Sequence, residues 1–426
     1  MSNSINEITF NVPGSKSITQ RALITSALAT GDSRLYHPLD SEDTRLLRKA
    51  LRNFGINIDD SKSIWEIKGS NGKITCPNNE IFMGNNGTGI RFLISVSALC
   101  NGSTVLTGNS RMMERPAGPL LDALKQLGVN AFSINNTGCP PVKIISEGLR
   151  GGSVNLSASI SSQFLSSLLL VAPYAKDPIT ITLDGKLVSR PYVNITLRVM
   201  EDFGVKVKEE GNKFNIPLSK YKGIDYKIEA DASSASYFFG AAAITSSSIR
   251  IENLPPEPIQ GDAQFCDILG KMGCIVNKSK NGTVVTGPGL DKLHGIEIDM
   301  SKWPDVVPTL AVVAAFAQGK TIIKNVEHLR VKETDRIKAV VTELNKIGCE
   351  AEELPDGMII NGDPNRLRPA TINTYDDHRI AMCFAIAKLL IPEISFDDKD
   401  VVKKSFPEFW NYWNRLEREL KNQVSS

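Results

Sequence analysis

Apolar and polar positions along the chain repeat as an amphipathic helix, a glycine and a short strand. In the first instance the apolar residues fall at 46, 47, 50, 51 and 54, which is helical spacing. The glycines that follow such a helix are Gly55, Gly128, Gly204, Gly273 and Gly348. Glycine directly after a helix predicts a left-handed helix end, because glycine adopts positive φ at little cost. A strand-like run follows each one, for example residues 205–207.

The spacing of these glycines predicts a repeated structural unit. They are separated by 73, 76, 69 and 75 positions. Helix–glycine–strand connections are common, but five near-equal spacings indicate copies of one unit of about 70 residues. The aromatic segment 409–413 resembles a further copy that lacks the glycine. We therefore predict an α/β chain of α+β repeats, with six units, three in each of two domains.

Composition favours a soluble enzyme over a nucleic-acid coat or a membrane protein. The 426 residues exceed one typical domain, and 49 Lys and Arg against 47 Asp and Glu leave a net charge of +2. No apolar run could cross a bilayer, and residues 1–10 do not look like a signal peptide. The seven cysteines are scattered without a C-x-x-C pair, which predicts a reducing, cytoplasmic location. With no H-x-x-x-H pair either, we expect no metal.

Residues 13–23, PGSKSITQRAL, carry the first candidate chemistry. A glycine-containing turn places Lys16, Ser17 and Arg21 at the start of an apolar helix. Unpaired backbone N–H groups at a helix start, joined by two cations, predict an anion site. The segment is not a Walker loop, because the second glycine is missing. A capped helix with two solvated cations would show the same pattern, so this segment alone leaves both readings open.

Further clusters combine glycine, hydroxyl and cationic residues before apolar helices. Each one taken alone also fits a helix cap or a solvated face, and some of the charges in residues 330–336 must be structural because they cannot share one helical stripe. Asp305 differs, because it lies among apolar and proline residues, where desolvation can raise its pKa toward that of a useful general base. A simple N-cap is the alternative for Asp305. The clusters are residues 84–91, 111–116, 159–165, 189–192, 330–336, 376–379 and 403–407.

As an ordered set, these motifs resemble those of the 5-enolpyruvylshikimate-3-phosphate synthases, members of the enolpyruvyl transferase family. The resemblance covers about residues 11–409, and it implies an inside-out α/β barrel fold with the active site in the interdomain cleft. It assigns residues 1–14 and 230–426 to one domain, completed by the N-terminal strand, and residues 15–229 to the other. The motifs are PGSKSITQRAL, GNNGTGIR, RMMERPAG, SSQFL, VSRPY, DASSASYF, RVKETDR, DDHRIAM and KSFPEF.

The resemblance implies transfer of the enolpyruvyl group of phosphoenolpyruvate to the 5-hydroxyl of shikimate 3-phosphate, with release of phosphate. This is a step of the shikimate pathway toward chorismate and the aromatic amino acids. The family needs no cofactor or metal, and glyphosate inhibits it at the phosphoenolpyruvate site. We expect a monomer whose partners are these small molecules, with no nucleic acid and no membrane.

The resemblance also assigns roles to residues. Two substrates with about six negative charges repel each other, so cations must gather around them. Asp305 would take the proton of the 5-hydroxyl, and Glu333 and Lys16 are the candidates to protonate C3 of the enol. The phosphoenolpyruvate ligands would be Lys16, Gly87, Arg115, Gln163, Arg336, Arg379 and Lys404. The shikimate 3-phosphate ligands would be Lys16, Ser17, Arg21, Ser161, Ser162, Gln163, Ser189, Tyr192, Asp305, His328 and Lys332.

Some positions depart from the common bacterial pattern. His328 stands where an asparagine helps to bind shikimate 3-phosphate, and Gly89, Ile90 and Phe92 replace the commoner Ala, Met and Pro. These last three changes lie in the packing behind the site, and we expect them to tune affinity rather than chemistry.

Three other functions are alternatives to this interpretation. The sister transferase that acts on UDP-N-acetylglucosamine carries a cysteine in the loop before its R-P motif, and residues 109–114 contain none. RNA 3′-phosphate cyclases share a related repeat but need a nucleotide-accepting histidine and a surface for RNA. A catalytically inactive binding subunit would not need Asp305, Glu333 and Lys16, because binding alone requires no base.

Overall fold

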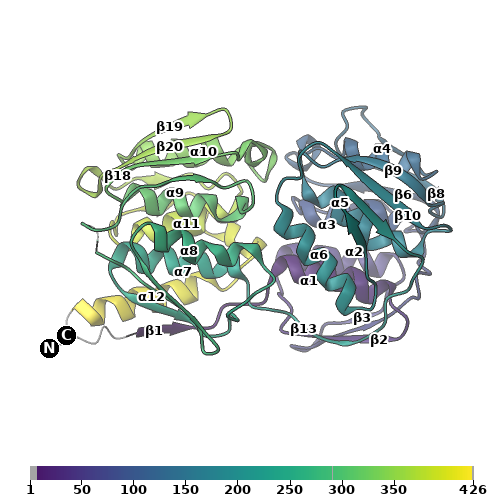
Figure 1. The fold of residues 1–426 in the computed structure, drawn as a ribbon, viewed down its shortest axis with the longest axis horizontal. Helices are drawn as coiled ribbons and strands as arrows, with labels where there is room; N and C mark the ends of the chain where they lie inside the picture. The colour runs from purple at the N-terminus through teal and green to yellow at the C-terminus, as the bar shows by residue number, and fades with distance from the viewer. Residues whose placement is uncertain (1–6, 290, 425–426) are drawn as a thin grey trace. The chain divides into compact units, whose positions relative to one another are not determined.

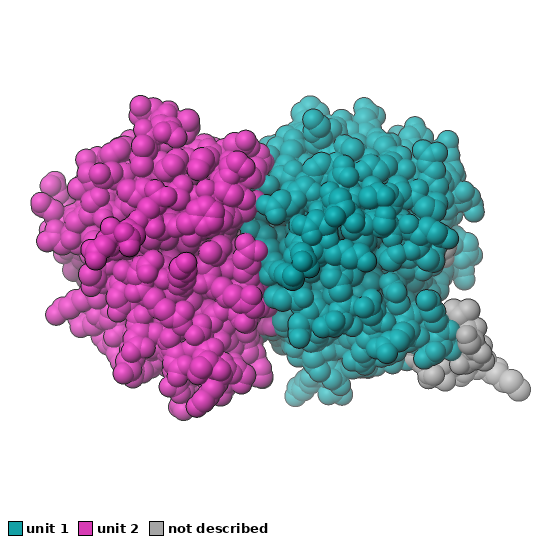
Figure 2. All heavy atoms as spheres, turned by 180° about the vertical axis from the view of Figure 1, so that it is seen from behind, with its two compact units in different colours: residues 1–13, 229–426 teal, residues 14–228 magenta. Residues whose placement is uncertain are grey.

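The computed structural model describes residues 7–289 and 291–424, with the side chain of Val424 excluded. The chain divides into two compact units, coloured in Figure 2: unit 1 is Met1–Pro13 with Glu229–Ser426, and unit 2 is Gly14–Ile228. Residues 1–6 and 425–426 of the domain ranges expected above lie outside the described residues. The chain thus passes from unit 1 to unit 2 after Pro13 and returns after Ile228.

Unit 2 contains three sheets of one topology. In each sheet the first two strands pair in parallel and the remaining pairs are antiparallel. In spatial order they are β13 (Asp225–Lys227), β2 (Asp32–Tyr36), β4 (Trp65–Lys68) and β3 (Ile58–Asp59); β5 (Ile81–Phe82), β6 (Asn101–Thr107), β8 (Val142–Glu147) and β7 (Asn130–Ser133); and β9 (Gly152–Ser157), β10 (Ile179–Asp184), β12 (Lys213–Ile216) and β11 (Lys208–Glu210).

Three nearly fully buried helices form the centre of unit 2. They are α1 (Lys16–Leu28), α3 (Gly87–Ser97) and α5 (Ser162–Val171), and each contacts the other two. The other helices bury one face each: α2 (Glu42–Asn53), α4 (Gly118–Gln126) and α6 (Arg190–Asp202). Two 3-10 turns, η1 (Met112–Glu114) and η2 (Ala172–Tyr174), complete the unit. Helices therefore lie inside and sheets outside, as the inside-out fold requires.

Unit 1 repeats this plan with one reduced sheet. Its sheets are β1 (Glu7–Phe10), β14 (Ser248–Ile251), β16 (Gly282–Thr286) and β15 (Ile275–Ser279); β17 (Glu297–Asp299), β18 (Gly319–Lys324), β20 (Gly357–Gly362) and β19 (Glu350–Leu354); and the parallel pair β21 (Thr371–Ile372) and β22 (Ser395–Phe396). Strand β1 comes from the N-terminal segment and pairs with β14, so a strand from the start of the chain completes this unit.

The central helices of unit 1 are also buried and in mutual contact. They are α7 (Ala232–Thr245), α9 (Val307–Ala315) and α11 (His378–Lys388), and in Figure 1 they lie between β1 and the sheet that contains β18 and β20. The outer helices are α8 (Phe265–Lys271), α10 (Arg336–Lys346) and α12 (Phe409–Val424). The 3-10 turns are η3 (Gly261–Gln264), η4 (Pro304–Val306), η5 (Glu327–Val331), η6 (Pro364–Arg366) and η7 (Asp400–Lys404). No helix of the described chain is long and apolar enough to span a membrane.

The five glycines end their helices as predicted. Their φ angles are 85°, 83°, 92°, 112° and 90° in chain order. One strand begins later than expected, because the residues after Gly204 form β11 at Lys208–Glu210 and not at 205–207. The last of the six repeats has no glycine after its helix α12, and in the described residues this repeat has only the two strands β21 and β22. The repeat is thus shortened where its glycine is missing.

The repeat determines where the motifs lie. Five of the six buried helices begin within segments that the sequence marked, at Lys16, Gly87 and Ser162 in unit 2 and at Ala232 and His378 in unit 1. Helix α9 begins at Val307, two positions after Asp305. Helix starts present unpaired N–H groups and the positive end of the helix dipole. Each unit therefore has three such helix starts, considered unit by unit below.

Candidate active site

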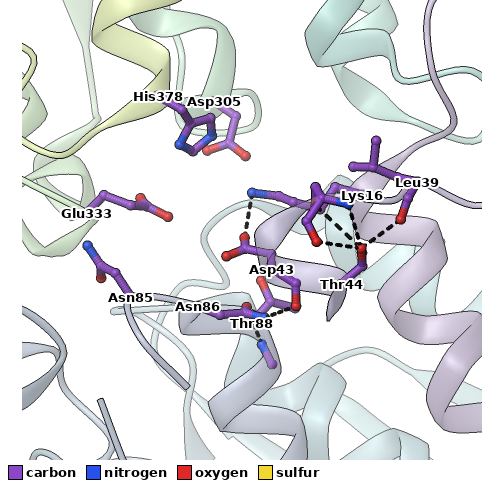
Figure 3. Close-up of polar contacts among 12 residues, drawn as sticks. Lys16, Leu39, Asp43, Thr44, Asn85, Asn86, Thr88, Asp305, Glu333 and His378 are labelled. Atoms are coloured by element: carbon purple, nitrogen blue, oxygen red, sulfur yellow. Dashed lines mark hydrogen bonds and ion pairs between the residues drawn. The ribbon is translucent and has the colours of Figure 1, made fainter. Parts of the chain in front are cut away.

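Lys16, the first residue of α1, is held beside the start of α3. Its Nζ lies 3.0 Å from Oδ2 of Asp43, a buried carboxylate on α2. Asn86 caps α3 and donates from Nδ2 to the backbone oxygen of Asp43 at 2.7 Å (Figure 3). Two motifs that are 70 positions apart in sequence therefore meet through Asp43. The sequence does not predict Asp43 as a site residue, because an acidic residue in the first turn of an amphipathic helix carries no distinguishing signal.

Arg21 is a buried cation surrounded by neutral acceptors. Its side chain is 1% exposed and donates to Thr196 Oγ1 at 2.7 Å, Ser166 Oγ at 3.4 Å and the backbone oxygens of Tyr192 at 3.1 Å and Ser17 at 2.8 Å. Within residues 7–289 and 291–424, no carboxylate forms an ion pair with it. Burial lowers the pKa of Arg21 to about 10, a shift that Tyr192 opposes. The guanidinium is still charged at neutral pH, so an anion bound here would offset a buried positive charge.

Gln163 joins the starts of α5 and α3. Its Nε2 donates to Thr88 Oγ1 at 2.9 Å, and its Oε1 accepts a hydrogen bond from Arg91. Ser161 caps α5 by accepting from the backbone N–H of Gln163 at 3.2 Å, and Ser162 is the first helical residue. The predicted series of hydroxyls and an amide before an apolar helix is therefore present and faces the GNNGTGIR turn.

Ser189 is held in a strained conformation at the start of α6. Its φ is 53° and its ψ is 40°, a left-handed geometry that is uncommon for residues other than glycine. Its backbone oxygen accepts from the N–H of Tyr192 at 3.0 Å. Strain of this kind is frequent at ligand sites, where surrounding structure fixes a side chain in place.

Arg115 lies against Gly87 in the glycine-rich turn. Its Nη1 donates to both the backbone oxygen and Oδ1 of Asn85, each at 2.9 Å. A Cβ on Gly87 would lie 2.5 Å from Cζ of Arg115, so only glycine lets the helix start come this close to the guanidinium. Behind this turn, the Phe92 ring centroid is 5.3 Å from Cζ of Arg21. The unusual residue at position 92 therefore packs against the buried cation.

Unit 1 is organised around Arg336, the first residue of α10. The guanidinium is 1% exposed and contacts three carboxylates. Nε donates to Asp377 Oδ2 at 2.7 Å, Nη2 to Glu333 Oε2 at 2.7 Å, and Nη1 to Asp305 Oδ1 at 3.1 Å. Burial alone lowers the pKa of Arg336, but these carboxylates outweigh burial and raise its pKa above the ordinary value.

Asp305, in η4, shares its two oxygens between two arginines. Oδ1 faces Arg336, and Oδ2 lies 2.8 Å from Nη2 of Arg379. Burial raises the pKa of Asp305, but the charges of Arg379, Lys332 and Arg336 outweigh burial and hold the pKa well below its usual range. The expectation that desolvation gives this carboxyl a raised pKa is therefore wrong, because the sequence did not reveal which cations surround it.

His328 is buried in η5 and uncharged at neutral pH. Burial, together with the nearby Lys332 ammonium, lowers the pKa of His328 to about 3, although Asp305 opposes the shift. A neutral imidazole has one donor and one acceptor, as a side-chain amide does. His328 can thus replace the asparagine of the common pattern in hydrogen bonding.

Lys404, the last predicted phosphoenolpyruvate ligand, is buried at the end of η7. Its charge opposes the rise in the pKa of Asp376 that burial causes. Arg330 is structural, since Nη1 bonds Asp335 at 2.9 Å and Glu353 at 3.0 Å. As the sequence predicts, some charges of the 330–336 run thus take part in structural ion pairs. In the described part of the chain, no three His, Cys, Asp or Glu side chains are grouped to hold a metal ion.

Comparisons of the sequence and of the fold with known proteins agree on one family. The family model described as EPSP synthase (3-phosphoshikimate 1-carboxyvinyltransferase) matches residues 4–413. The chain is 43% identical to the 3-phosphoshikimate 1-carboxyvinyltransferase of Nostoc punctiforme, over 97% of each chain. It is also 43% identical to the enzyme of that name from Vibrio vulnificus, over 94% of each chain. The solved EPSP synthase from Acinetobacter baumannii superposes with a TM-score of 0.78 at 28% identity, over 96% of each chain.

The buried imidazole of His328 predicts a specific loss of stability in acid. A histidine in the unfolded chain binds its proton near pH 6.5, whereas the folded chain binds it only near pH 3. Stability is therefore fully present above pH 6.5 and falls as the pH drops through this window, by about 2 kcal/mol at pH 5. In urea unfolding at pH 7.5 and pH 5, His328→Asn should lose about 2 kcal/mol less than the parent. His294→Asn, at an exposed site, should behave as the parent does. Equal losses in the parent and His328→Asn would show that the imidazole is not desolvated.

Proposed function

The chain belongs to the EPSP synthase family, and we propose that it transfers the enolpyruvyl group of phosphoenolpyruvate to the 5-hydroxyl of shikimate 3-phosphate. The observation that carries this proposal is the pair of buried arginines, Arg336 and Arg379, that share the carboxylate of Asp305. A base between two anion-binding guanidiniums suits a reaction between a hydroxyl and an anionic enol phosphate. The acceptor and the donor enter from the family, and the residue roles are inferred below.

Shikimate 3-phosphate is held chiefly by unit 2. The buried guanidinium of Arg21 supports this role, because its described partners are all neutral and its charge is available to a ligand anion. Ser17, Tyr192 and Ser189 lie on the segments that pack against Arg21 or flank it. Ser161, Ser162 and Gln163 add the start of α5, where hydroxyls and N–H groups suit a phosphate or a polyol. Lys332 and His328 of unit 1 supply an ammonium and a neutral hydrogen-bonding group for the same substrate.

The cations that we assign to phosphoenolpyruvate belong to both units. In unit 2, Lys16 lies at the start of α1 and Arg115 lies beside the start of α3. Gly87 gives the ligand close access to the backbone at the start of α3. Arg336, Arg379 and Lys404 of unit 1 supply two planar forks and a compact charge. Gln163 presents its amide from the start of α5. These groups match the carboxylate and phosphate of a small dianionic or trianionic ligand.

The chemistry proceeds by addition and elimination. Asp305 accepts the proton of the 5-hydroxyl while that oxygen forms a bond to C2 of phosphoenolpyruvate, and the C2–C3 π electrons take a proton at C3. Glu333 or Lys16 delivers that proton, which gives a tetrahedral intermediate that still carries the phosphate. The group that delivered the proton, now deprotonated, then takes a proton from C3, and the electrons of that C–H bond re-form the double bond. Phosphate leaves with the electron pair of the C2–O bond and takes the proton held by Asp305.

Substrate binding itself tunes the base. While Arg336 and Arg379 contact Asp305, its pKa is well below the usual range, and the carboxylate is a weak base. Anionic groups of the substrate compete with Asp305 for these guanidiniums and place negative charge beside it. Both effects raise the pKa of a carboxyl. Asp305 therefore becomes a stronger base when phosphoenolpyruvate is in place, which couples proton removal to the presence of the second substrate.

We propose that the enzyme acts as a monomer in the cytoplasm. The seven cysteines are all free thiols, which suits a reducing compartment.

The acceptor decides the function most directly. Release of inorganic phosphate from phosphoenolpyruvate should occur with shikimate 3-phosphate and should be absent with UDP-N-acetylglucosamine. The matched control is Asp305→Asn, which should lower kcat by a factor on the order of 10² to 10⁴ because base removal typically costs that much. Turnover with the nucleotide sugar alone would assign the chain to the sister transferase. A kcat above half the parent value in Asp305→Asn would exclude Asp305 as the base.

Glyphosate should inhibit in competition with phosphoenolpyruvate, and Gly87→Ala should weaken this inhibition. The added methyl group meets the Arg115 guanidinium, so the guanidinium must shift into the space that the longer inhibitor needs. Overpacking costs about 1–3 kcal/mol, which predicts an inhibition constant roughly 5- to 150-fold higher. The KM for phosphoenolpyruvate should rise less. Gly118→Ala is the control, since its methyl would meet nothing closer than 3.8 Å. Equal factors in both constants, or millimolar inhibition of the parent, would contradict this account.

A further inference from the structure

The segment that leads into α11 has an unusual backbone. Tyr375 has a φ of 55° and Asp376 a φ of 53°, so two consecutive residues are left-handed. This conformation is costly for a tyrosine, and it persists only where the surroundings fix it. Directly after this turn come Asp377, which caps α11, and Arg379 in its first turn. The turn therefore determines where two members of the Arg336 network lie.

Glu343 on α10 forms hydrogen bonds with this turn and with the residues just before it. Its side chain is fully buried, with 0% exposure, and the polar partners of its carboxylate among the described residues are Tyr375, Asn373 and Lys346, none of which is assigned to the proposed reaction. Oε1 accepts from the hydroxyl of Tyr375 at 2.7 Å, and Oε2 accepts from the backbone N–H of Asn373 at 3.1 Å. Lys346 offsets the charge, with Nζ 2.6 Å from Oε2, and also donates to the backbone oxygen of Thr371 at 3.1 Å.

Helix α10 also contacts the end of this segment that leads into α11. Arg336 begins α10 and forms the bidentate pair with Asp377, and Glu343 follows seven positions later. Seven residues are about two helical turns, so both side chains project from one face of α10. Asp397 also accepts from the N–H and Oγ1 of Thr374 at 2.9 and 2.8 Å. The segment between β21 and α11 is thus held by hydrogen bonds at several of its residues.

We propose that Glu343 is a positioning residue for the reaction, which sets the location of Asp377 and Arg379 through the Tyr375–Asp376 turn. This inference rests on the proposed function, because it treats Arg379 as a ligand of phosphoenolpyruvate. The alternative is that Glu343 only anchors unit 1. The two roles differ in one respect: an anchor affects unfolding alone, whereas a positioning residue changes substrate binding through Arg379.

The test is a double-mutant cycle on purified full-length protein. Glu343→Gln keeps the size of the side chain but places an N–H₂ group where Tyr375, Asn373 or Lys346 donates a hydrogen bond. We therefore expect the KM for phosphoenolpyruvate to rise about tenfold. The KM for shikimate 3-phosphate should change less than about twofold. In an Arg379→Lys background the same change should have little further effect, because the group that it positions is already altered. Tyr375→Phe, which removes one contact, should raise the KM for phosphoenolpyruvate by a smaller factor, and it carries the test if Glu343→Gln does not fold.

The matched control is Glu297→Gln, which breaks an exposed glutamate–lysine pair with Lys324 in the same unit and should leave every constant unchanged. A Glu343→Gln variant with a lowered melting temperature and an unchanged KM would overturn the proposal, as would an equal effect in the Arg379→Lys background. A parent without turnover would refute the proposed function instead. The positioning role would then be judged by amide hydrogen exchange at Asp377 and Arg379. Faster exchange in Glu343→Gln than in Glu297→Gln would support the structural part of the proposal, that Glu343 fixes the turn before Asp377 and Arg379, and equal exchange would overturn it.

Discussion

The carboxylate of Asp305, shared between the guanidiniums of Arg336 and Arg379, is the interaction on which the candidate site of unit 1 depends. Two buried cations need nearby negative charge, and breaking a buried pair typically costs 3–5 kcal/mol because the remaining charge is uncompensated. Asp305, Glu333 and Asp377 provide that charge within unit 1. They occupy the guanidinium edges that we propose for a substrate carboxylate or phosphate. The network of described contacts therefore compensates the buried cations and keeps the pKa of Asp305, the proposed base, low.

Unit 2 meets the same requirement in a different way. Arg21 is buried among hydroxyl and backbone oxygens, and it has lost part of its basicity to desolvation rather than gained a carboxylate partner. Lys16 has such a partner in Asp43. The contrast suits the two proposed ligands. Under the proposed assignments, the phosphate that remains unchanged through the reaction would bind Arg21, whose described partners are neutral, and the reacting enol phosphate would bind cations whose carboxylate contacts it replaces.

The sequence predicted the fold well because the repeat is local. Each glycine after a helix reports a backbone conformation that depends on its neighbours alone, so Gly128 or Gly348 could be interpreted without any contact information. The helix starts at Lys16, Gly87 and Ser162 were predictable for the same reason. The partners of the site residues were not. Asp377 lies 41 positions from Arg336, and Tyr375 lies 32 positions from Glu343, so only the folded chain brings them together. The error over the pKa of Asp305 has this origin.

The ionisation of Asp305 is the most direct test of this account. Carbon-13 NMR of aspartate-labelled protein, with the Asp305 signal assigned from its loss in Asp305→Asn, would follow the carboxyl as the pH is lowered. We predict that without substrates it stays ionised below pH 4, where an ordinary aspartate is half protonated. An unreactive phosphoenolpyruvate mimic with shikimate 3-phosphate should raise the pKa of this carboxyl. A resting carboxyl that titrates at or above the ordinary aspartate value would contradict the account, because Arg336 and Arg379 would then not be holding Asp305 as a weak base.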